Sequence, residues 1–247
     1  MAGMANTRPT SGHSPRARLR RPLDLSGPGV LESVGEDQIA YYRARASWYD
    51  NVYACVGEYD RGRELNDQWL GDLAEVRRGL SAATLRGQCV ELGAGTGYWT
   101  ELLIDRVECL WALDASPEVV EVARTRLGSR AAKVRFETLD LWRWQPSQMW
   151  DSAAAFFFLE HVPDEILPGL LTKLHAALRP GSPFFVAEGG AQDFAPVIEG
   201  RSIDGRAFDV VERRRSVEEF ETVLGAAGFS VRVATEARLV HLLAIRD

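Results

Sequence analysis

The chain has few cysteines, few lysines and no long apolar run. Its 247 residues include three cysteines, and only two of its 29 basic residues are lysines. Three cysteines without Cys-x-x-Cys spacing disfavour a disulfide framework and a cysteine zinc site. The longest uninterrupted apolar run, Ala153–Leu159, has seven residues, well short of the ~20 that span a bilayer. We therefore expect no transmembrane helix. Because residues 1–30 also lack the apolar stretch of a signal peptide, we expect a cytoplasmic protein.

Charge is unevenly distributed along the sequence. The net charge is −6, yet residues 1–30 carry five arginines and one acid, which leaves −10 for the remainder. An acidic body lacks the basic face that a nucleic-acid-binding protein needs. A short basic tail is usually solvated. We predict neither nucleic acid nor membrane as a partner, and both a monomer and a homodimer remain open.

Periodicity divides the chain into three regions. Residues 1–34 have no apolar period and predict a mobile tail. Residues 35–80 carry apolar side chains at helical spacing and predict a helical region, which the resemblance given below implies is a lid. From residue 81 to residue 247, short apolar runs alternate with amphipathic stretches. The predicted strands of this part are Cys89–Leu92, Cys109–Leu113, Val134–Thr138, Ser152–Phe158, Pro183–Glu188, Phe229–Ala234 and Leu239–Ile245.

Strand–helix alternation with nearly continuous apolar strands predicts an α/β fold, in which a parallel sheet is covered on both faces. The last two predicted strands, Phe229–Ala234 and Leu239–Ile245, are joined by a short connection. Because a parallel crossover needs a dozen or more residues, we expect the last strand to run antiparallel to its neighbour.

A glycine-rich turn, Gly93-Ala94-Gly95-Thr96-Gly97, follows the first predicted strand. Glycines allow positive φ angles and let a ligand approach the backbone closely. In an open α/β sheet such a turn lies at the carboxyl end of a strand, where ligands bind. A dinucleotide site would place a small residue at position 98. Tyr98 stands there, so a nicotinamide cofactor fits poorly.

Three acids surround this turn in the predicted sheet. Glu91 lies in the strand before it, Asp114 ends the second strand and Asp140 follows the third. A carboxylate at Glu91 would repel a pyrophosphate and suits a positively charged ligand. The carboxylate of Asp114 can accept hydrogen bonds from both hydroxyls of a ribose. The carboxylate of Asp140 can accept a hydrogen bond from the amine of an adenine, while its neighbour Leu141 packs on the adenine ring. Together they indicate a nucleoside ligand without phosphate.

The run Val90–Gly97 resembles the cofactor loop of class I S-adenosylmethionine-dependent methyltransferases. Phe157–Pro163 is similar to the fourth-strand segment of that family, and Leu178–Gly181 to its turn before the fifth strand. Tyr41–Ala46 with Tyr49 resembles the lid of UbiE-like small-molecule enzymes. The resemblance covers about residues 36–247. It implies a single Rossmann-like, doubly wound sheet of seven strands, the last antiparallel, with an N-terminal helical lid.

This resemblance also implies a set of cofactor-binding residues and S-adenosylmethionine as the cofactor. The set is Tyr42, Tyr49, Glu91, Gly93, Ala94, Gly95, Thr96, Gly97, Asp114, Ala115, Asp140, Leu141 and Phe157. The sequence departs from magnesium-dependent catechol-type relatives, because Phe157 occupies the region of their metal-binding aspartate. We therefore expect no metal.

His161 is the candidate general base, because it follows the fourth strand and histidine titrates near neutrality. Its alternative role is to cap the loop or pack against the lid. Tyr41, Arg45, Trp99, His161 and Glu188 are the candidate acceptor-binding residues. The tyrosines and Arg45 of the first helix serve equally well as a functional lid or as an amphipathic face docked on the sheet, and Trp99 serves equally well as a pocket wall or as core.

We conclude from the sequence that the chain is an S-adenosylmethionine-dependent methyltransferase acting on a small organic acceptor, such as a natural-product intermediate. One alternative is a protein of this fold that binds the cofactor without methyl transfer, as a binding module or a rearrangement catalyst. A second, weaker alternative is an NAD(P)-dependent oxidoreductase.

Overall fold

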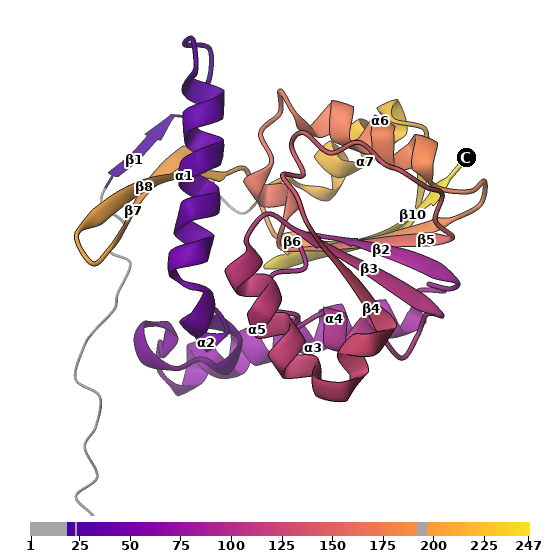
Figure 1. The fold of residues 1–247 in the computed structure, drawn as a ribbon, viewed down its shortest axis with the longest axis horizontal. Helices are drawn as coiled ribbons and strands as arrows, with labels where there is room; N and C mark the ends of the chain where they lie inside the picture. The colour runs from indigo at the N-terminus through magenta and orange to yellow at the C-terminus, as the bar shows by residue number, and fades with distance from the viewer. Residues whose placement is uncertain (1–18, 23, 192–196) are drawn as a thin grey trace, which may run out of the picture.

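The computed structural model describes residues 19–22, 24–191 and 197–247. A seven-stranded sheet with helices on both faces forms the body, and a three-stranded sheet lies on the other side of helix α1 (Figure 1). The strands of the large sheet are β2 (Gln88–Leu92), β3 (Cys109–Asp114), β4 (Val134–Thr138), β5 (Ser152–Phe156), β6 (Pro183–Gly189), β9 (Phe229–Glu236) and β10 (Leu239–Arg246). The helices are α1 (Val30–Ala44), α2 (Asn51–Ala54), α3 (Arg63–Ala82), α4 (Thr100–Leu103), α5 (Pro117–Leu127), α6 (Leu167–Ala177) and α7 (Val217–Ala226).

The large sheet has the strand order β4-β3-β2-β5-β6-β10-β9. β2 to β6 pair in parallel, and β10 runs antiparallel to both β6 and β9. The predicted fold class is therefore confirmed, including the antiparallel last strand. The glycine-rich turn after β2 lies at the centre of this sheet, where strand order reverses and ligands of α/β proteins bind.

Two apolar layers cover the sheet. Val90 and Leu92 of β2 pack in the layer formed with α6 and α7, whereas Cys89 packs in the layer formed with α3 and α4. Alternate side chains of a strand point to opposite faces, so a strand buried on both faces is apolar along most of its length. Figure 1 shows these helices on the two sides of the sheet.

Helix ends follow local sequence cues. Ser116 caps α5 by accepting from the backbone N–H of Val119, with Pro117 in the first turn. α6 begins at Leu167, with Pro168 in its first turn. Proline is tolerated at these positions because its missing N–H would have no helical partner there. Ser216 and Glu219 form a capping box at the start of α7.

The small sheet was not anticipated from the sequence. It consists of β1 (Leu19–Pro22), β7 (Val197–Ile203) and β8 (Arg206–Glu212), in the order β1-β7-β8. β7 and β8 form a hairpin joined by Asp204 and Gly205, which have φ angles of 48° and 83°. An Asp-Gly pair between alternating strands is the strongest short-range indication of such a hairpin, so this motif could have revealed it.

The predicted tail, residues 1–34, is too long at its carboxyl end. β1 pairs antiparallel with β7, α1 begins at Val30 and not near Glu36, and Val34 is 2% exposed. Val34 packs on the small sheet, whose presence the sequence did not indicate. Residues 1–18 and 23 of the predicted tail lie outside the described residues.

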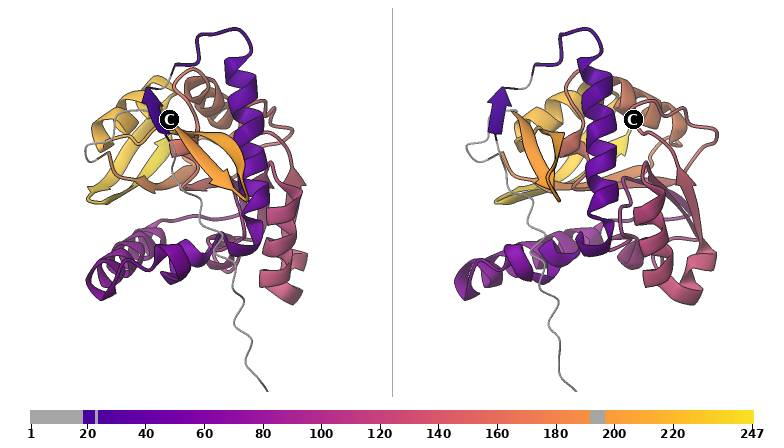
Figure 2. Two further views of the ribbon diagram at one scale, coloured as in Figure 1. Left: turned by 90° about the vertical axis from the view of Figure 1, so that its left-hand side faces the viewer. Right: turned by 60° about the vertical axis from the view of Figure 1, so that its left-hand side comes forward.

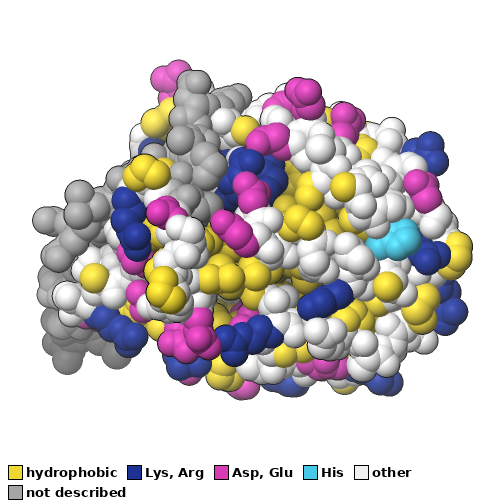
Figure 3. Space-filling model, turned by 90° about the horizontal axis from the view of Figure 1, so that it is seen from above, with side chains coloured by type: hydrophobic (Ala, Val, Ile, Leu, Met, Phe, Trp, Pro, Cys, Tyr) yellow, Lys and Arg dark blue, Asp and Glu magenta, His cyan; other side chains and the backbone are white. Residues whose placement is uncertain are grey.

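α1 stands between the two sheets (Figure 2). One side of it packs on the small sheet through Tyr41, which contacts Phe208 and Val210. Another side faces the carboxyl ends of the large sheet, through Gln38 and Tyr42. On the face of the molecule seen in Figure 3, acidic and basic side chains are interspersed among apolar ones. None of the helices in the described ranges is long and apolar enough to cross a membrane.

Candidate functional site

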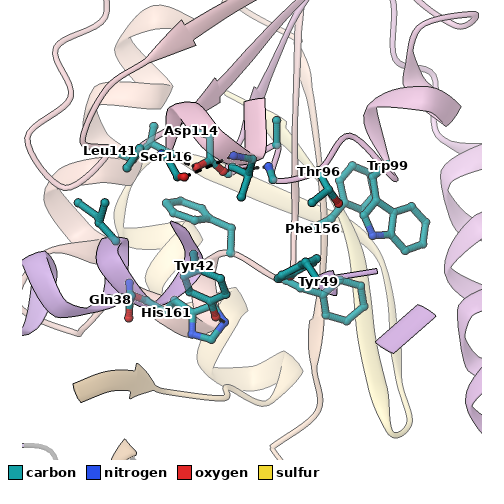
Figure 4. A pocket seen from close by; sticks show the side chains of 18 of the residues that line it. Gln38, Tyr42, Tyr49, Thr96, Trp99, Asp114, Ser116, Leu141, Phe156 and His161 are labelled. Atoms are coloured by element: carbon teal, nitrogen blue, oxygen red, sulfur yellow. Dashed lines mark hydrogen bonds between the residues drawn. The ribbon is translucent and has the colours of Figure 1, made fainter. Parts of the chain in front are cut away.

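A cavity with about 890 Å³ of free space opens at the carboxyl ends of β2, β3 and β5, under α1. The residues predicted to bind the cofactor that line it are Tyr42, Tyr49, Gly93, Ala94, Gly95, Thr96, Asp114, Ala115, Asp140, Leu141 and Phe157. Figure 4 shows Asp114 and Ser116 on one side of this cofactor-side cavity and Tyr42 with His161 on the opposite side. The fold thus brings residues far apart in sequence around one space.

The three glycines of the turn have positive φ angles, 69° at Gly93, 54° at Gly95 and 79° at Gly97. A Cβ atom at Gly95 would meet nothing within 4 Å, so the backbone there borders open space. A Cβ at Gly93 would lie 2.6 Å from Phe158, and one at Gly97 2.8 Å from the Cβ of Ala123. Gly97 therefore serves helix packing and does not line the cavity, contrary to its predicted place in the cofactor site.

Asp114 opens onto the cavity from the end of β3. Its two carboxylate oxygens accept from the backbone N–H groups of Gly95 and Ser116, both at 2.9 Å. Burial raises the pKa of Asp114 above its ordinary value, against the lowering effect of these backbone donors. On the same wall, Asp140 accepts from the backbone N–H of Trp142 at 2.9 Å.

The lining of the cofactor-side cavity has two carboxylates and several aromatic rings, but no lysine or arginine among the described residues. The hydroxyls and the exocyclic amine of a nucleoside could donate hydrogen bonds to these carboxylates. A pyrophosphate would be repelled by them, with no lysine or arginine to compensate. The open space at Gly95 leaves room for a ligand against the backbone. These residues fit a cationic nucleoside ligand such as S-adenosylmethionine.

Glu91 does not reach the cavity. It is 1% exposed and accepts a hydrogen bond of 2.7 Å from the hydroxyl of Thr100. Burial raises the pKa of Glu91 to about 8. The predicted contact with a charged ligand is therefore absent, because the strand turns this side chain toward α4, beneath the turn.

Glu188 also lies beneath the site. It is fully buried, and its carboxylate accepts from the backbone N–H groups of Phe158, Leu159 and Glu160 at 2.8–3.2 Å. Burial, with the nearby charge of Glu160, raises the pKa of Glu188 to about 8. Among the described residues it lines neither this cavity nor the second one, so it supports the loop before His161 rather than contacting an acceptor.

His161 has both ring nitrogens engaged. Its Nδ1 lies 2.8 Å from the carbonyl oxygen of Val211, and its Nε2 lies 2.6 Å from the hydroxyl of Tyr42. A carbonyl can only accept, so Nδ1 carries the proton and Nε2 of the neutral ring accepts from Tyr42. Burial raises the pKa of Tyr42 well above its ordinary value, which keeps its hydroxyl protonated.

Gln38 holds α1 against this histidine. Its amide nitrogen donates to the carbonyl of His161 at 3.0 Å, and its oxygen accepts from the backbone N–H of Val211 at 3.1 Å. Sequence reasoning missed Gln38. It lies one helical turn before Tyr42, so their shared face of α1 could have identified it.

Asp50 links the segment that follows α1 to the glycine-rich turn. Its carboxylate accepts from the hydroxyl of Thr96 at 2.5 Å and forms an ion pair with Arg126. The cavity lining also includes residues that sequence reasoning missed: Gly35, Ile39, Tyr53, Tyr98, Ser116, Val119, Phe156 and Phe158. Several of them directly follow a predicted residue in the chain, which is the only indication that the sequence offers.

A second cavity, with about 1580 Å³ of free space, adjoins the first. Tyr42, Tyr49, Tyr53, Phe157 and His161 line both cavities and form a shared wall. The small sheet contributes three residues to the second cavity, Arg201, Val210 and Glu212. This acceptor-side cavity is therefore built largely from residues between Tyr41 and Asp72. The β7–β8 hairpin, which sequence reasoning did not foresee, completes it.

The candidate acceptor residues separate between the two cavities. Tyr41 and Arg45 line only the acceptor-side cavity, and His161 lines both. Trp99 lines only the cofactor-side cavity, where it is 3% exposed and stacks on Phe156 at 4.7 Å between ring centroids. The structure thus places Trp99 on the other side from its predicted acceptor role.

Comparisons with known proteins agree with this geometry. A family model described as a methyltransferase domain matches residues 89–181. A malonyl-[acyl-carrier protein] O-methyltransferase from Paenibacillus sp. (strain JDR-2) is 28% identical over an alignment of 193 residues, and the match covers 72% of this chain and 68% of that protein.

Among solved structures, the chain is similar to DhpI, both in a complex with SAH and in a complex with SAM and HEP. The TM-score is 0.72 for each, with sequence identities of 29% and 28%. The matches cover 86% and 87% of this chain and 97% and 98% of the DhpI chains.

Proposed function

From the premise that this chain is a class I S-adenosylmethionine-dependent methyltransferase, we propose that it methylates a small organic acceptor held in the acceptor-side cavity. One observation carries this proposal: five residues line both cavities and form their common wall. Ligands in the two cavities would contact the same five side chains, and we propose that their reacting atoms meet between these side chains. Methyl transfer requires this arrangement, because acceptor oxygen, methyl carbon and sulfur must align.

We assign the cofactor to the cavity under α1. Asp114 would hold the ribose hydroxyls, Asp140 the adenine amine, and Leu141 would pack on the ring. When bound, S-adenosylmethionine supplies a methyl group on a sulfonium sulfur that leaves as a neutral thioether. The apolar and aromatic side chains of the wall would exclude water from this group, and α1 would close over it.

We propose that the acceptor atom is oxygen. The O-methyltransferase relative supports this, since it is 28% identical over most of both chains. An acceptor that keeps its proton until attack would need a base, and Nε2 of His161 is the group on the shared wall that could take it. An acceptor that is already an anion needs none, and then His161 would only position Tyr42 through their 2.6 Å hydrogen bond.

The test is to incubate the protein with S-adenosylmethionine and panels of small acids, phenols and alcohols, and to detect S-adenosylhomocysteine by mass spectrometry. We expect acceptor-dependent formation of this product. Tight binding of S-adenosylhomocysteine in calorimetry without turnover on any panel would favour a protein that binds the cofactor without methyl transfer. Binding of NADH with none of the sulfur ligand would favour the oxidoreductase alternative.

A further inference from the structure

We propose that the acceptor carries an oxyanion, a carboxylate or a phosphonate, and that Arg45 binds it. This inference rests on the methyl transfer proposed above and names the chemical class of the acceptor. Arg45 lines the acceptor-side cavity and not the cofactor-side cavity, so the anion it would take is not part of the cofactor.

Arg45 is a buried cation without a carboxylate. Its side chain is 7% exposed, and among the described residues no acid lies within ion-pair distance of it. Nη1 donates to the hydroxyl of Tyr41 at 2.9 Å and Nη2 to that of Tyr59 at 2.6 Å. Its Nε is buried with no hydrogen-bond partner. Three of the five N–H groups of a guanidinium thus remain unused.

Aromatic rings surround this guanidinium instead of acids. Its central carbon lies 4.7–5.9 Å from five ring centroids, those of Tyr41, Tyr42, Trp48, Tyr49 and Tyr59. The ring faces attract the cation, but they provide no net negative charge. A buried charge without a counter-charge is costly, and a bound anion would remove this cost.

The other arginines of the acceptor-side cavity already have partners or lie at its exposed edge. Arg201 pairs with Glu199 and Glu212, and Arg238 pairs with Asp72. Arg214 likewise pairs with Glu212. Arg61 is exposed and lies over the ring of Trp69. With five arginines and four acids in the lining, the cavity has one positive charge in excess, and the unpaired buried one is Arg45.

An oxyanion acceptor also explains the state of His161. The acceptor oxygen would form the new O–C bond with its own lone pair, while the electrons of the C–S bond return to sulfur. The anionic and sulfonium charges cancel, and no proton is released. A base is then unnecessary, which agrees with an Nε2 atom already engaged by Tyr42. Methylation removes one negative charge from the acceptor: a carboxylate becomes a neutral ester and a phosphonate dianion becomes a monoanion. The attraction to Arg45 is then weaker, which favours release of the product.

The experiment measures thermal unfolding of the protein saturated with S-adenosylhomocysteine, at fixed ionic strength, with matched acids and amides. The probes are butyrate, phenylacetate and methylphosphonate, with butyramide and phenylacetamide as neutral counterparts. We expect at least one acid to raise the unfolding temperature by about 2 °C or more while its amide does not, because an anion binding only the folded state stabilises it. A rise in unfolding temperature with butyrate or phenylacetate would identify a carboxylate acceptor, and a rise with methylphosphonate would identify a phosphonate acceptor.

The variants Arg45→Met and Arg45→Gln should lose this preference for acids, and either one suffices if the other does not fold. Arg45→Lys should retain part of it. Arg179→Met is the matched control, because Arg179 is also an arginine but is paired with Asp151 and lines neither cavity. It should behave as the wild type does.

The inference is overturned if acids and amides act alike on the wild type, or if the neutral Arg45 variants keep the acid-specific shift. An acid-specific shift that depends on Arg45, without turnover of any acid, would uphold the anion site and refute methyl transfer. Turnover of neutral acceptors alone, with no acid-specific shift in unfolding temperature, would refute the anion site and support methyl transfer.

Discussion

At the scale of single residues, the surroundings of a carboxylate decide what it does. Asp114 opens onto the cofactor-side cavity, whereas Glu91 and Glu188 are turned inward and bind a hydroxyl and three backbone N–H groups. All three belong to strands of the same sheet, and all have a raised pKa because of burial. The face of the strand from which each carboxylate projects, and its position along the strand, decide whether it contacts a ligand or supports the loop.

Asp114→Ala should weaken the binding of S-adenosylhomocysteine by about 2 kcal/mol or more, because two ribose hydroxyls would lose a charged acceptor. Calorimetry at pH 7 measures this change. The matched control is Asp105→Ala, which removes an acid that is 63% exposed. An Asp114→Ala variant that folds and binds with unchanged affinity would place the ribose elsewhere.

His161→Ala tests the choice between base and positioning residue. Since Nε2 accepts from Tyr42, we expect the variant to lower kcat by less than about tenfold with an oxyanion acceptor, against roughly 10²–10⁴-fold for a general base. Tyr42→Phe removes the same hydrogen bond and should cause a similar loss. A large loss for His161→Ala with a small one for Tyr42→Phe would establish the base instead.

Glu91 should make the stability of the protein depend on pH. Burial raises its pKa to about 8 from the ordinary 4.5, so the folded state keeps a proton that the unfolded chain releases. The stability gained in this way is complete below pH 4.5 and is lost as the pH rises to 8. Glu91→Gln should therefore gain stability relative to the wild type across this window, by up to about 1.4 kcal/mol per pH unit. Urea unfolding at pH 5, 6, 7 and 8 measures the difference, and parallel curves would contradict the assignment.

At the scale of elements, the β7–β8 hairpin and α1 build the acceptor side. The hairpin contributes Arg201, Val210 and Glu212 to that cavity and nothing to the cofactor-side cavity, among the described residues. α1 packs on the hairpin and also reaches over the cofactor site. An alteration of the hairpin should therefore affect the acceptor without affecting the cofactor.

Gly205→Val tests this separation. Gly205 has a φ angle of 83°, and a Cβ atom there would meet nothing within 4 Å, so the cost is one of backbone conformation alone. A β-branched residue in this region costs roughly 1–2 kcal/mol. We expect lower stability and slower turnover, with unchanged affinity for S-adenosylhomocysteine by calorimetry. Gly205→Asn is the milder control, because asparagine tolerates positive φ. An equal loss of cofactor affinity would show that the two sides are not separable.

At the scale of the whole molecule, two sheets, α1, the segment after it and α3 enclose a pair of adjoining cavities. Asp50 connects the segment after α1 to the glycine-rich turn through Thr96, and Gln38 connects α1 to the loop of His161. A ligand in the cofactor-side cavity would therefore contact residues between Gly35 in α1 and His161.

S-adenosylhomocysteine at about 100 times its Kd should stabilise the fold by about 2.7 kcal/mol. For a chain of this length that corresponds to a rise in Tm of about 5–10 °C. NADH and NADPH at the same concentration should leave Tm unchanged, because the cofactor-side cavity has no lysine or arginine among its described lining residues. A comparable rise with either nicotinamide cofactor would contradict the cofactor assignment.

The sequence by itself determined the parts that depend on local pattern. Apolar runs such as Ala153–Phe156, the glycine-rich turn and the short final connection specify buried parallel strands, a ligand-binding turn and an antiparallel last strand. Asp114 and Asp140 were found because parallel strands end at one edge of a sheet, so their positions in the chain place them around the turn.

Only the tertiary structure decided which side chains face a cavity. Glu91 and Glu188 have the same strand-end setting as Asp114, but packing against Thr100 and the loop before His161 encloses them. The tail boundary and the place of β1 in the small sheet depend on pairing between residues about 180 positions apart, such as Arg20 and Glu199, which no local pattern records. Arg45 is unpaired because the fold surrounds it with aromatic rings instead of acids, and that environment exists only once α1, the segment after it and the hairpin have packed together.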